Sequence, residues 1–439
     1  MAMAEREAVA TELVRRLRAA GHEAYLAGGC VRDRLLGREP LDYDIATSAP
    51  PETVQALFPR TVPVGAQFGV VLVIADGMPV EVATFRSDAA YVDGRRPSAV
   101  HFGSAREDAR RRDFTINALF LDPLTGEVVD FVGGQADLRA GIIRAIGDPR
   151  ARIAEDRLRM LRAIRLAARL DFTIEPLTLE AIRAAAATVT DMAAERIGDE
   201  VVKILTEGAA RRGFELLAAT SLLAAVLPEV ARMQGIEQSP DYHPEGDVFR
   251  HTLLAIEQLP AGVSETLALG LLLHDVGKPV TAARRDNRIT FYGHTTVGAE
   301  LAVAICQRLR RSRATWERVA YLVTNHLRLV DAPEMRLSTL KRLLRHEGFD
   351  ELLALARMDA LASNRDLRYV EFCEQRRAEL AREEIRPPRL LGGDDLIDLG
   401  YQPGPRLGEI LRALEEAQLE GEVTSRVEAE RFVRSRFPP

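Results

Sequence analysis

The spacing of hydrophobic residues divides the chain into a mixed first part and a helical remainder. Up to about residue 138, runs such as EAYLAGG, DYDIAT and GVVLVIADGMPVEVATF have the apolar density of short strands and are separated by turn residues such as Asp-Gly. After Gly141, apolar residues recur every three or four positions among Ala, Arg and Glu, which predicts helices. We therefore expect an α+β fold, in which a mixed sheet with helices is followed by all-α segments.

Two interruptions subdivide the helical remainder. One is QGIEQSPDYHPEGD at 234–247, and the other is EEIRPPRLLGGDD at 383–395. A chain of 439 residues is long enough for about two to four domains. The predicted domains are 1–138, 139–233, 234–382 and 383–439.

Composition restricts the compartment and the partners. No window approaches the roughly 20 apolar residues of a membrane span, and the first residues lack the apolar core of a signal peptide. The three cysteines are far apart in the sequence, which suits a reducing compartment. We expect a cytoplasmic protein with no membrane partner.

Charge is distributed unevenly. The formal net charge of −6 disfavours nucleic-acid binding, yet residues 139–172 contain nine arginines and no lysine against four acidic residues. Arginine suits planar, bidentate recognition of phosphates and bases. The alternative is a solvated helix face.

Two aspartates follow a glycine-rich turn in the stretch GGCVRDRLLGREPLDYD. Residues i and i+2 of a strand point to one face, so Asp42 and Asp44 are expected side by side. Two such charges need a cation between them, and Mg²⁺ prefers oxygen ligands and retains substrate phosphates. Glu81, on a later strand, is either a third catalytic carboxylate or an edge-strand surface charge.

The glycine pair is a candidate phosphate site. Gly28 and Gly29 would let a triphosphate approach the backbone, with Arg32 as a clamp and Asp33 paired to a neighbouring arginine. The alternative is an ordinary turn.

The segment EDRLRMLRAIRLAARL, which begins at Glu155, is a candidate base reader. Four arginines recur every three or four residues and so share a helix face: Arg159, Arg162, Arg165 and Arg169. Asp156 lies three residues before Arg159 and accepts hydrogen bonds, whereas arginine only donates them. Cytosine and adenine both present an amino donor beside a ring-nitrogen acceptor, and guanine and uracil present the opposite order. The pair would accept C or A, unless it is only an intrahelical salt bridge.

Four segments in order, GGCVRD with LDYD, RRDFTINAL, EDRLRMLRAIRLAARL and ERIGDEVVKIL, resemble the class II tRNA nucleotidyltransferase and bacterial poly(A) polymerase family over roughly residues 22–230. The resemblance implies a polymerase-β-like nucleotidyltransferase head, followed by a helical neck, body and tail. It also implies untemplated addition of CCA to tRNA from CTP and ATP. The roles implied are Mg²⁺ binding at Asp42 and Asp44, triphosphate contact at Gly29 and Arg32, sugar and phosphate contact at Arg112 and Asp113, base reading at Asp156 and Arg159, and nucleotide binding at Arg162 and Arg165.

A histidine pattern lies further along. HTLLAIEQLP, LALGLLLHDVGKP and FYGHTTVGAE resemble an HD phosphohydrolase domain. Its candidate metal ligands are His251, His274, Asp275 and Asp359, a donor set that suits Mn, Fe, Ni, Zn or Mg. Two further histidines, His294 and His326, serve either a second metal or helix capping and packing.

The stretch 84–102, TFRSDAAYVDGRRPSAVHF, resembles the loop that family members use to switch from C to A. Some relatives that add only CC lack this loop, so its presence argues against a CC-only enzyme. The alternatives are an A-only enzyme, a poly(A) polymerase, or a metal-dependent phosphohydrolase acting through the histidine pattern.

Overall fold

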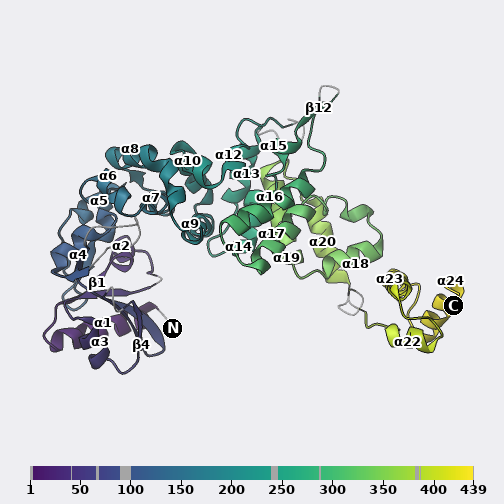
Figure 1. The fold of residues 1–439 in the computed structure, drawn as a ribbon, viewed down its shortest axis with the longest axis horizontal. Helices are drawn as coiled ribbons and strands as arrows, with labels where there is room; N and C mark the ends of the chain where they lie inside the picture. The colour runs from purple at the N-terminus through teal and green to yellow at the C-terminus, as the bar shows by residue number, and fades with distance from the viewer. Residues whose placement is uncertain are drawn as a thin grey trace. The chain divides into compact units, whose positions relative to one another are not determined.

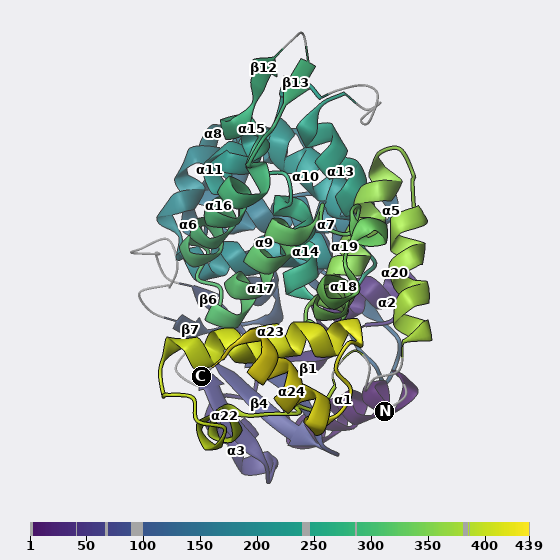
Figure 2. The ribbon, with the colours of Figure 1, turned by 90° about the vertical axis from the view of Figure 1, so that its right-hand side faces the viewer.

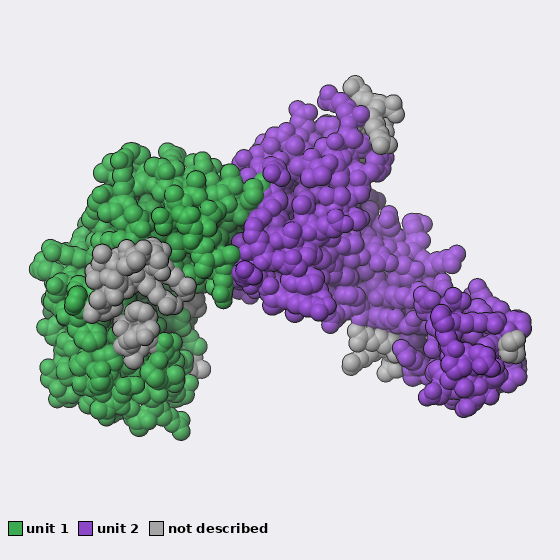
Figure 3. All heavy atoms as spheres, in the orientation of Figure 1, with its two compact units in different colours: residues 1–228 green, residues 229–439 purple. Residues whose placement is uncertain are grey.

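The chain forms two compact units, residues 1–228 and 229–439 (Figure 3). The computed structural model describes residues 3–40, 42–65, 69–88, 100–238, 246–285, 288–380, 385 and 387–438. Residues 89–99 of the proposed switching loop lie outside the described residues. The prediction of four domains at the boundaries given above stays a prediction.

A mixed sheet organises the first unit (Figure 1). Among the described residues it has seven strands, in the order β3-β4-β5-β2-β1-β8-β9. The strands are β1 (Ala24–Ala27), β2 (Asp44–Thr47), β3 (Thr61–Gly65), β4 (Val70–Ala75), β5 (Met78–Thr84), β8 (Leu119–Leu121) and β9 (Val128–Asp130), with β6 (Arg86–Asp88) and β7 (Val100–Phe102) as a separate pair. β2 runs parallel to β5, and the other neighbours in the sheet are antiparallel. Val80 and Val82 are fully buried on β5 while Glu81 between them is exposed, the alternation of a strand with one buried face.

The position of β5 decides one expectation about Glu81. Because β5 lies between β4 and β2, its Glu81 is not on an edge strand, and that alternative is wrong. The parallel register places Glu81 opposite Asp44.

Helices cover the sheet and continue beyond it in the first unit. They are α1 (Met3–Ala19), α2 (Gly29–Leu35), α3 (Pro51–Leu57), α4 (Ala105–Arg111), α5 (Gly134–Ala140), α6 (Pro149–Glu155), α7 (Arg159–Leu170), α8 (Pro176–Ala185), α9 (Ala194–Thr206), α10 (Ala210–Ala219) and α11 (Leu222–Val226). Short strands β10 (Ile142–Ile143) and β11 (Thr173–Ile174) pair in parallel. α7 buries Leu161 and Ile164 completely and packs against α9 and α10, while Arg165 of the same helix reaches Glu200 of α9.

The arginine-rich segment is two helices rather than one. Asp148 caps α6 by accepting a hydrogen bond from the backbone N–H of Arg150, and Pro149 follows as the first residue of the helix. The expected single helix is wrong, since α6 ends at Glu155 and Asp156 has an extended backbone (φ −146°, ψ 103°). The Asp156 carboxylate accepts the backbone N–H of Leu158 at 3.1 Å, and such local bonding competes with a continuous helix.

In the part of the second unit that the structure describes, the regular elements are helices and one hairpin. Its helices are α12 (Pro228–Ala231), which begins at the last residue of the first unit, then α13 (Val248–Glu257), α14 (Glu265–Leu273), α15 (Lys278–Thr281), α16 (His294–Arg308), α17 (Arg313–Asn325), α18 (Leu337–Leu344), α19 (Phe349–Ala362), α20 (Arg368–Glu379), α22 (Gly393–Asp398), α23 (Pro405–Glu420) and α24 (Arg426–Arg436). The hairpin of β12 (Ala283–Arg285) and β13 (Arg288–Thr290) projects from these helices (Figure 2). The mixed α+β fold with a helical remainder is therefore confirmed.

α14 is the centre of the second unit's core. Every residue from Leu267 to Leu273 is buried, and α13, α17 and α19 pack around this helix. α22, α23 and α24 share a separate apolar core that includes Leu396, Ile410 and Val433 (Figure 1). Among the residues that the structure describes, no helix is both long and apolar enough to cross a membrane.

Candidate functional site

An arginine-lined cavity of about 510 Å³ lies in the first unit. Its lining residues are Gly28, Gly29, Arg32, Asp44, Arg86, Arg111, Arg112, Asp113, Asn117, Asp156, Arg159, Arg162, Arg165, Leu166, Arg169 and Arg196. Nine of these are arginines, so the cavity suits a polyanionic ligand such as a nucleoside triphosphate. Among the predicted nucleotide and catalytic residues, only Asp42 and Glu81 are not part of this lining.

Asp44 and Glu81 lie opposite one another in the strand register where β2 begins. Asp44 is the first residue of β2 and is open to the cavity, whereas Asp42 precedes the strand. The expectation that both carboxylates lie on one face of a strand is therefore wrong. Burial by the surrounding protein raises the pKa of Asp44 to about 6, with Glu81 and Asp42 adding to the effect and Arg112 opposing it. Oxygen donors of this kind suit a hard divalent cation such as Mg²⁺. Among the described residues, however, Asp42, Asp44 and Glu81 do not form a group whose ligand atoms all lie within 4.8 Å of one another, so Mg²⁺ binding by these carboxylates stays a prediction.

Gly28 connects β1 to α2 at the cavity wall. It has a positive φ of 76°, which glycine adopts without strain. A Cβ at this position would lie 3.1 Å from Nη1 of Arg112. The positive φ therefore favours glycine, and a Cβ here would also require the Arg112 guanidinium to shift by a few tenths of an ångström.

Arg32 is buried and held rigidly. Its Nε donates to Asp33 Oδ1 at 2.8 Å and its Nη1 donates to Asn117 Oδ1 at 2.7 Å. Arg169 Nη2 donates to the other Asp33 oxygen at 3.2 Å. The predicted pairing of Asp33 with a neighbouring arginine is confirmed, and the network fixes two arginines at the cavity.

Asp113 fixes the guanidinium of Arg162 by hydrogen bonds. The guanidinium donates two hydrogen bonds to Asp113 Oδ2, at 2.9 Å from Nε and 2.6 Å from Nη2. Asn117 and the backbone N–H of Phe114 donate to Oδ1. Burial alone would raise the pKa of Asp113, but Arg162 and these donors lower it to about 2. Arg165 is held similarly, by Glu200 at 2.7 Å.

Asp156 and Arg159 each have a partner other than one another. Asp156 Oδ2 accepts from Arg196 Nη2 at 2.9 Å, while Arg159 Nη1 donates to Glu155 Oε2 at 2.6 Å and to the Arg152 carbonyl at 2.7 Å. The intrahelical salt bridge between Asp156 and Arg159 is therefore not what the structure contains. An acceptor and a donor lie at the same cavity, as base reading requires.

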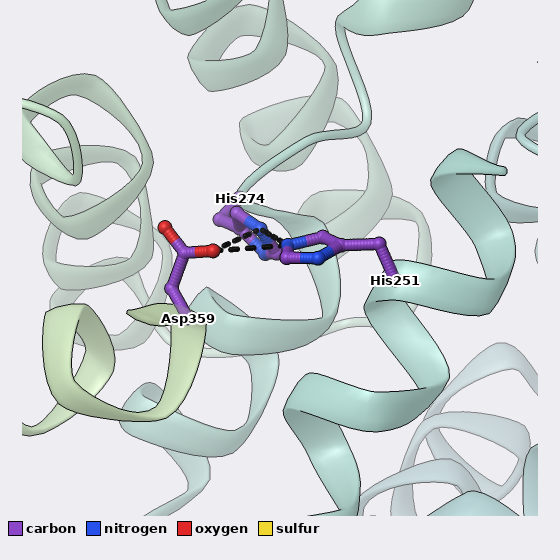
Figure 4. A group of neighbouring side chains, drawn as sticks. All are labelled: His251, His274 and Asp359. Atoms are coloured by element: carbon purple, nitrogen blue, oxygen red, sulfur yellow. Dashed lines mark hydrogen bonds and ion pairs between the residues drawn. The ribbon is translucent and has the colours of Figure 1, made fainter. Parts of the chain in front are cut away.

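A second cluster lies in the other unit, where His251, His274 and Asp359 point toward one another (Figure 4). His251 Nε2 lies 2.9 Å from Asp359 Oδ1 and 3.2 Å from His274 Nε2. His251 comes from α13, Asp359 comes from α19, and His274 directly follows the buried α14. The three predicted ligands are together and inside the fold.

Asp275 links this cluster to the remaining two histidines. Its Oδ2 lies 3.4 Å from His274 Nε2, and its Oδ1 lies 3.6 Å from His294 Nε2 and 3.7 Å from His326 Nε2. Burial alone would raise the pKa of Asp275, but Lys278, 2.6 Å from Oδ2, and the neighbouring histidines hold it well below its usual value. Asp275 therefore faces two groups of ligands rather than belonging only to the first.

The chemistry of this cluster fits divalent metals. Nδ1 of His274, His294 and His326 lies 2.7–2.8 Å from the backbone carbonyls of Leu271, Phe291 and Val323, so each Nε2 is directed inward. Burial lowers the pKa of His326 to about 4, and a neutral imidazole is the form that binds metal. The buried Nε2 of His294 has no hydrogen-bond partner among the described residues.

Three family models match consecutive parts of the chain. They are the poly A polymerase head domain at residues 24–144, the probable RNA and SrmB-binding site of polymerase A at 171–234, and the HD domain at 249–364. The CCA-adding enzyme of Levilactobacillus brevis is 35% identical over 411 residues, which cover 93% of this chain and 92% of the relative. The chain belongs to the tRNA nucleotidyltransferase family.

Other members of this family are similar over the same length. The A-adding tRNA nucleotidyltransferase of Deinococcus radiodurans is 36% identical over 428 residues, an alignment that covers 93% of this chain and 94% of the relative. The crystal structure of the Bacillus stearothermophilus CCA-adding enzyme in complex with CTP aligns with a TM-score of 0.67 at 30% identity, over 98% of this chain and 97% of that one. The resemblance inferred from the four sequence segments is confirmed.

Sequence reasoning missed several residues of the nucleotidyltransferase cavity. These are Arg86, Arg111, Asn117, Leu166 and Arg196. Arg111 and Asn117 lie inside RRDFTINAL and Arg196 inside ERIGDEVVKIL, two segments that carried the family resemblance. These two segments therefore indicated the right part of the chain, but the sequence does not indicate which of their side chains face the cavity.

Proposed function

We propose that this protein adds CCA to the 3′ end of tRNA from CTP and ATP, without a nucleic-acid template. The observation that carries the proposal is the single cavity lined by Asp44, Asp156 and Arg159 among nine arginines. It combines a cation-binding carboxylate, a hydrogen-bonding pair matched to C and A, and positive charge for a triphosphate. The CTP complex of the Bacillus stearothermophilus relative supports the same choice of ligand.

In the reaction, the tRNA 3′ hydroxyl attacks the α-phosphorus of the bound nucleotide, a new P–O bond forms, and pyrophosphate leaves. Asp42, Asp44 and Glu81 would hold Mg²⁺, which neutralises charge on the triphosphate and the leaving group when bound. Gly28, Gly29 and Arg32 would accommodate the phosphates. The others that contact the nucleotide would be Arg112, Asp113, Asp156, Arg159, Arg162 and Arg165.

Discrimination in this scheme comes from hydrogen-bond polarity. Asp156 accepts from the exocyclic amino group of C or A, and Arg159 donates to the adjacent ring nitrogen. Uracil or guanine would place an acceptor against the carboxylate and leave buried polar groups unpaired.

A specific observation favours one alternative, because the Deinococcus radiodurans relative is an A-adding enzyme. An A-only enzyme, or a poly(A) polymerase, would use the same carboxylates and arginines. The test is to supply CTP or ATP separately to tRNA lacking its last three nucleotides and to tRNA ending in CC. CCA addition predicts CTP use on the first and ATP use on the second, with α-phosphate label retained and pyrophosphate released. ATP use on tRNA ending in CC without any CTP use would identify the A-only enzyme.

Catalysis in the head is tested with Asp44→Asn, which should abolish both incorporation and pyrophosphate release in Mg²⁺. Incorporation at the wild-type rate would contradict the proposed role of Asp44. A role for the protein mainly as a hydrolase would follow if His274→Ala abolished the principal activity and Asp44→Asn did not.

We also propose that the second unit binds a divalent metal and hydrolyses a phosphate ester. The ligands would be His251, His274, Asp275 and Asp359, with His294 and His326 on the other side of Asp275. The supporting observation is the buried cluster of imidazole and carboxylate donors with their Nε2 atoms directed inward.

This second proposal is tested by calorimetric titration of the purified protein with Mn²⁺, Ni²⁺, Zn²⁺ and Mg²⁺, followed by assay on bis-p-nitrophenyl phosphate. His274→Ala should lose metal binding and hydrolysis while tRNA end addition continues. His346→Ala is the matched control, because His346 stacks on Tyr321 and is not part of the cluster. Metal binding without hydrolysis would reduce this unit to a scaffold.

The buried, unbridged state of Cys30, Cys306 and Cys373 supports a reducing location, and we propose the cytoplasm.

A further inference from the structure

Arg196 connects α9 to the residue that reads the base. It is the third residue of α9, forty positions beyond Asp156, and its Nη2 donates to Asp156 Oδ2 at 2.9 Å. The two side chains are only 28% and 18% exposed, so water screens this ion pair weakly. Arg196 also lines the nucleotide cavity.

Asp156 needs such a partner because of its place in the chain. It lies in the break between α6 and α7, outside the regular hydrogen-bond ladder of either helix. One carboxylate oxygen accepts the backbone N–H of Leu158, and that local contact leaves the second oxygen free to be oriented. Arg196 is the contact that orients it from a distant helix.

Arg159 is held independently of Arg196. Its guanidinium is fixed by Glu155 and by the carbonyl of Arg152, both within the preceding helix. Loss of Arg196 would therefore release the acceptor of the base-reading pair without releasing its donor.

We propose that Arg196 is a positioning residue that fixes Asp156 in the orientation that discriminates C and A from U and G. This inference rests on the proposed function of the same cavity. With Asp156 held in place, uracil meets an acceptor opposite its own carbonyl oxygen and is refused. With Asp156 free to rotate away, CTP loses a hydrogen bond and UTP no longer meets an opposing acceptor. CTP should then bind more weakly and UTP more tightly, and both changes lower the discrimination between them.

A second feature of Arg196 points toward the ligand. Its Nη1 is buried and finds no acceptor among the described residues. A buried guanidinium donor left without an acceptor is costly, and a ligand or an ordered water in the cavity would satisfy it. A side chain that served only to join two helices would not need this donor at the cavity wall.

The test compares Arg196→Met and Arg196→Lys with wild type in steady-state kcat/KM for CTP and for UTP, on tRNA lacking its last three nucleotides. Arg157→Met is the matched control, because Arg157 follows Asp156 directly but reaches Asp191 at 3.5 Å and does not line the cavity. We expect Arg196→Met to lower the CTP-to-UTP ratio about tenfold to a hundredfold, the effect of losing one charge-assisted hydrogen bond. Arg196→Lys should restore part of the ratio, and Arg157→Met should leave it unchanged.

Equal loss of CTP and UTP use in Arg196→Met, with the ratio unchanged, would overturn the inference and make Arg196 a structural residue. If circular dichroism finds Arg196→Met unfolded, Arg196→Gln replaces it and must lower the ratio in the same way. The proposed function fails separately, if wild type itself incorporates no CTP or uses UTP equally well.

Discussion

The ion pair between the buried Asp113 and the partly exposed Arg162 gives a prediction whose size can be worked out. Replacing Asp113 with Asn keeps the shape but removes the charge that receives two hydrogen bonds from Arg162, at 2.6 and 2.9 Å. The Asp113 pKa falls from 3.8 to about 2 in the fold. At about 1.4 kcal/mol per pKa unit, the ionised form contributes about 2–3 kcal/mol to folding.

The sign of the pH dependence follows from the lowered pKa. The contribution is fully present above the unfolded value near pH 4 and is lost as pH falls toward 2. Arg162 itself is 38% exposed, so water screens it after the substitution and the cost should stay near this range. At pH 7 we expect Asp113→Asn to lower the free energy of unfolding by about 2–3 kcal/mol.

The assay is urea unfolding of the full chain at pH 7, following the transition that added CTP stabilises. Asp191→Asn is the matched control, since Asp191 is 59% exposed and contacts Arg157 only at 3.5 Å, and it should cost less than about 1 kcal/mol. If Asp113→Asn cost less than about 0.5 kcal/mol, the ion pair of Asp113 and Arg162 would not be a stabilising element. The reasoning about how Arg162 is held would then be wrong.

Three further predictions concern the cavity and the metal sites. Gly28→Ala, at φ 76° and with its new Cβ 3.1 Å from Arg112 Nη1, should lower the free energy of unfolding in urea by about 1 kcal/mol and raise the KM for CTP several-fold. The control Gly37→Ala, at φ 67° with open space around it, should lower stability only. An unchanged KM in Gly28→Ala would contradict the close approach of Gly28 to Arg112. Burial raises the pKa of Asp44 to about 6, so below that pH Mg²⁺ must displace a proton from this carboxylate in order to bind. The Mg²⁺ affinity measured by calorimetry should therefore rise from pH 5 to about 6 and then level off. A flat pH profile would count against Asp44 as a ligand. Mn²⁺ at about 100 times its Kd should stabilise the second unit by about 2.7 kcal/mol in thermal unfolding, and Asp275→Asn, which removes the carboxylate between both histidine groups, should eliminate this gain.

Local spacing predicted those parts of the site that regular backbone creates. The arginines of α7 line the same cavity because residues three and four apart share a helix face. Asp44 begins β2 within DYDIAT, the segment whose apolar density predicted a short strand. The same rules failed for Asp42 and Asp156, because both lie in irregular backbone just outside an element.

Long-range pairings were beyond sequence reasoning for a different reason. Glu81 faces Asp44 through the register of two parallel strands, and Arg196 reaches Asp156 because α9 packs against α7. The position of Asp275 between two ligand groups likewise depends on how α14, α16 and α17 pack together. Such contacts are set by packing of the whole unit and not by any local pattern.

The central claim is that the protein alone, through Asp156 and Arg159, selects the nucleotide. The most direct measurement is calorimetric binding of CTP, ATP, UTP and GTP to the purified protein without tRNA, in wild type and in Asp156→Asn. We predict that wild type binds CTP and ATP at least about tenfold more tightly than UTP and GTP, and that Asp156→Asn loses this preference. Equal affinity of wild type for all four nucleotides would contradict the claim and assign selection to the RNA.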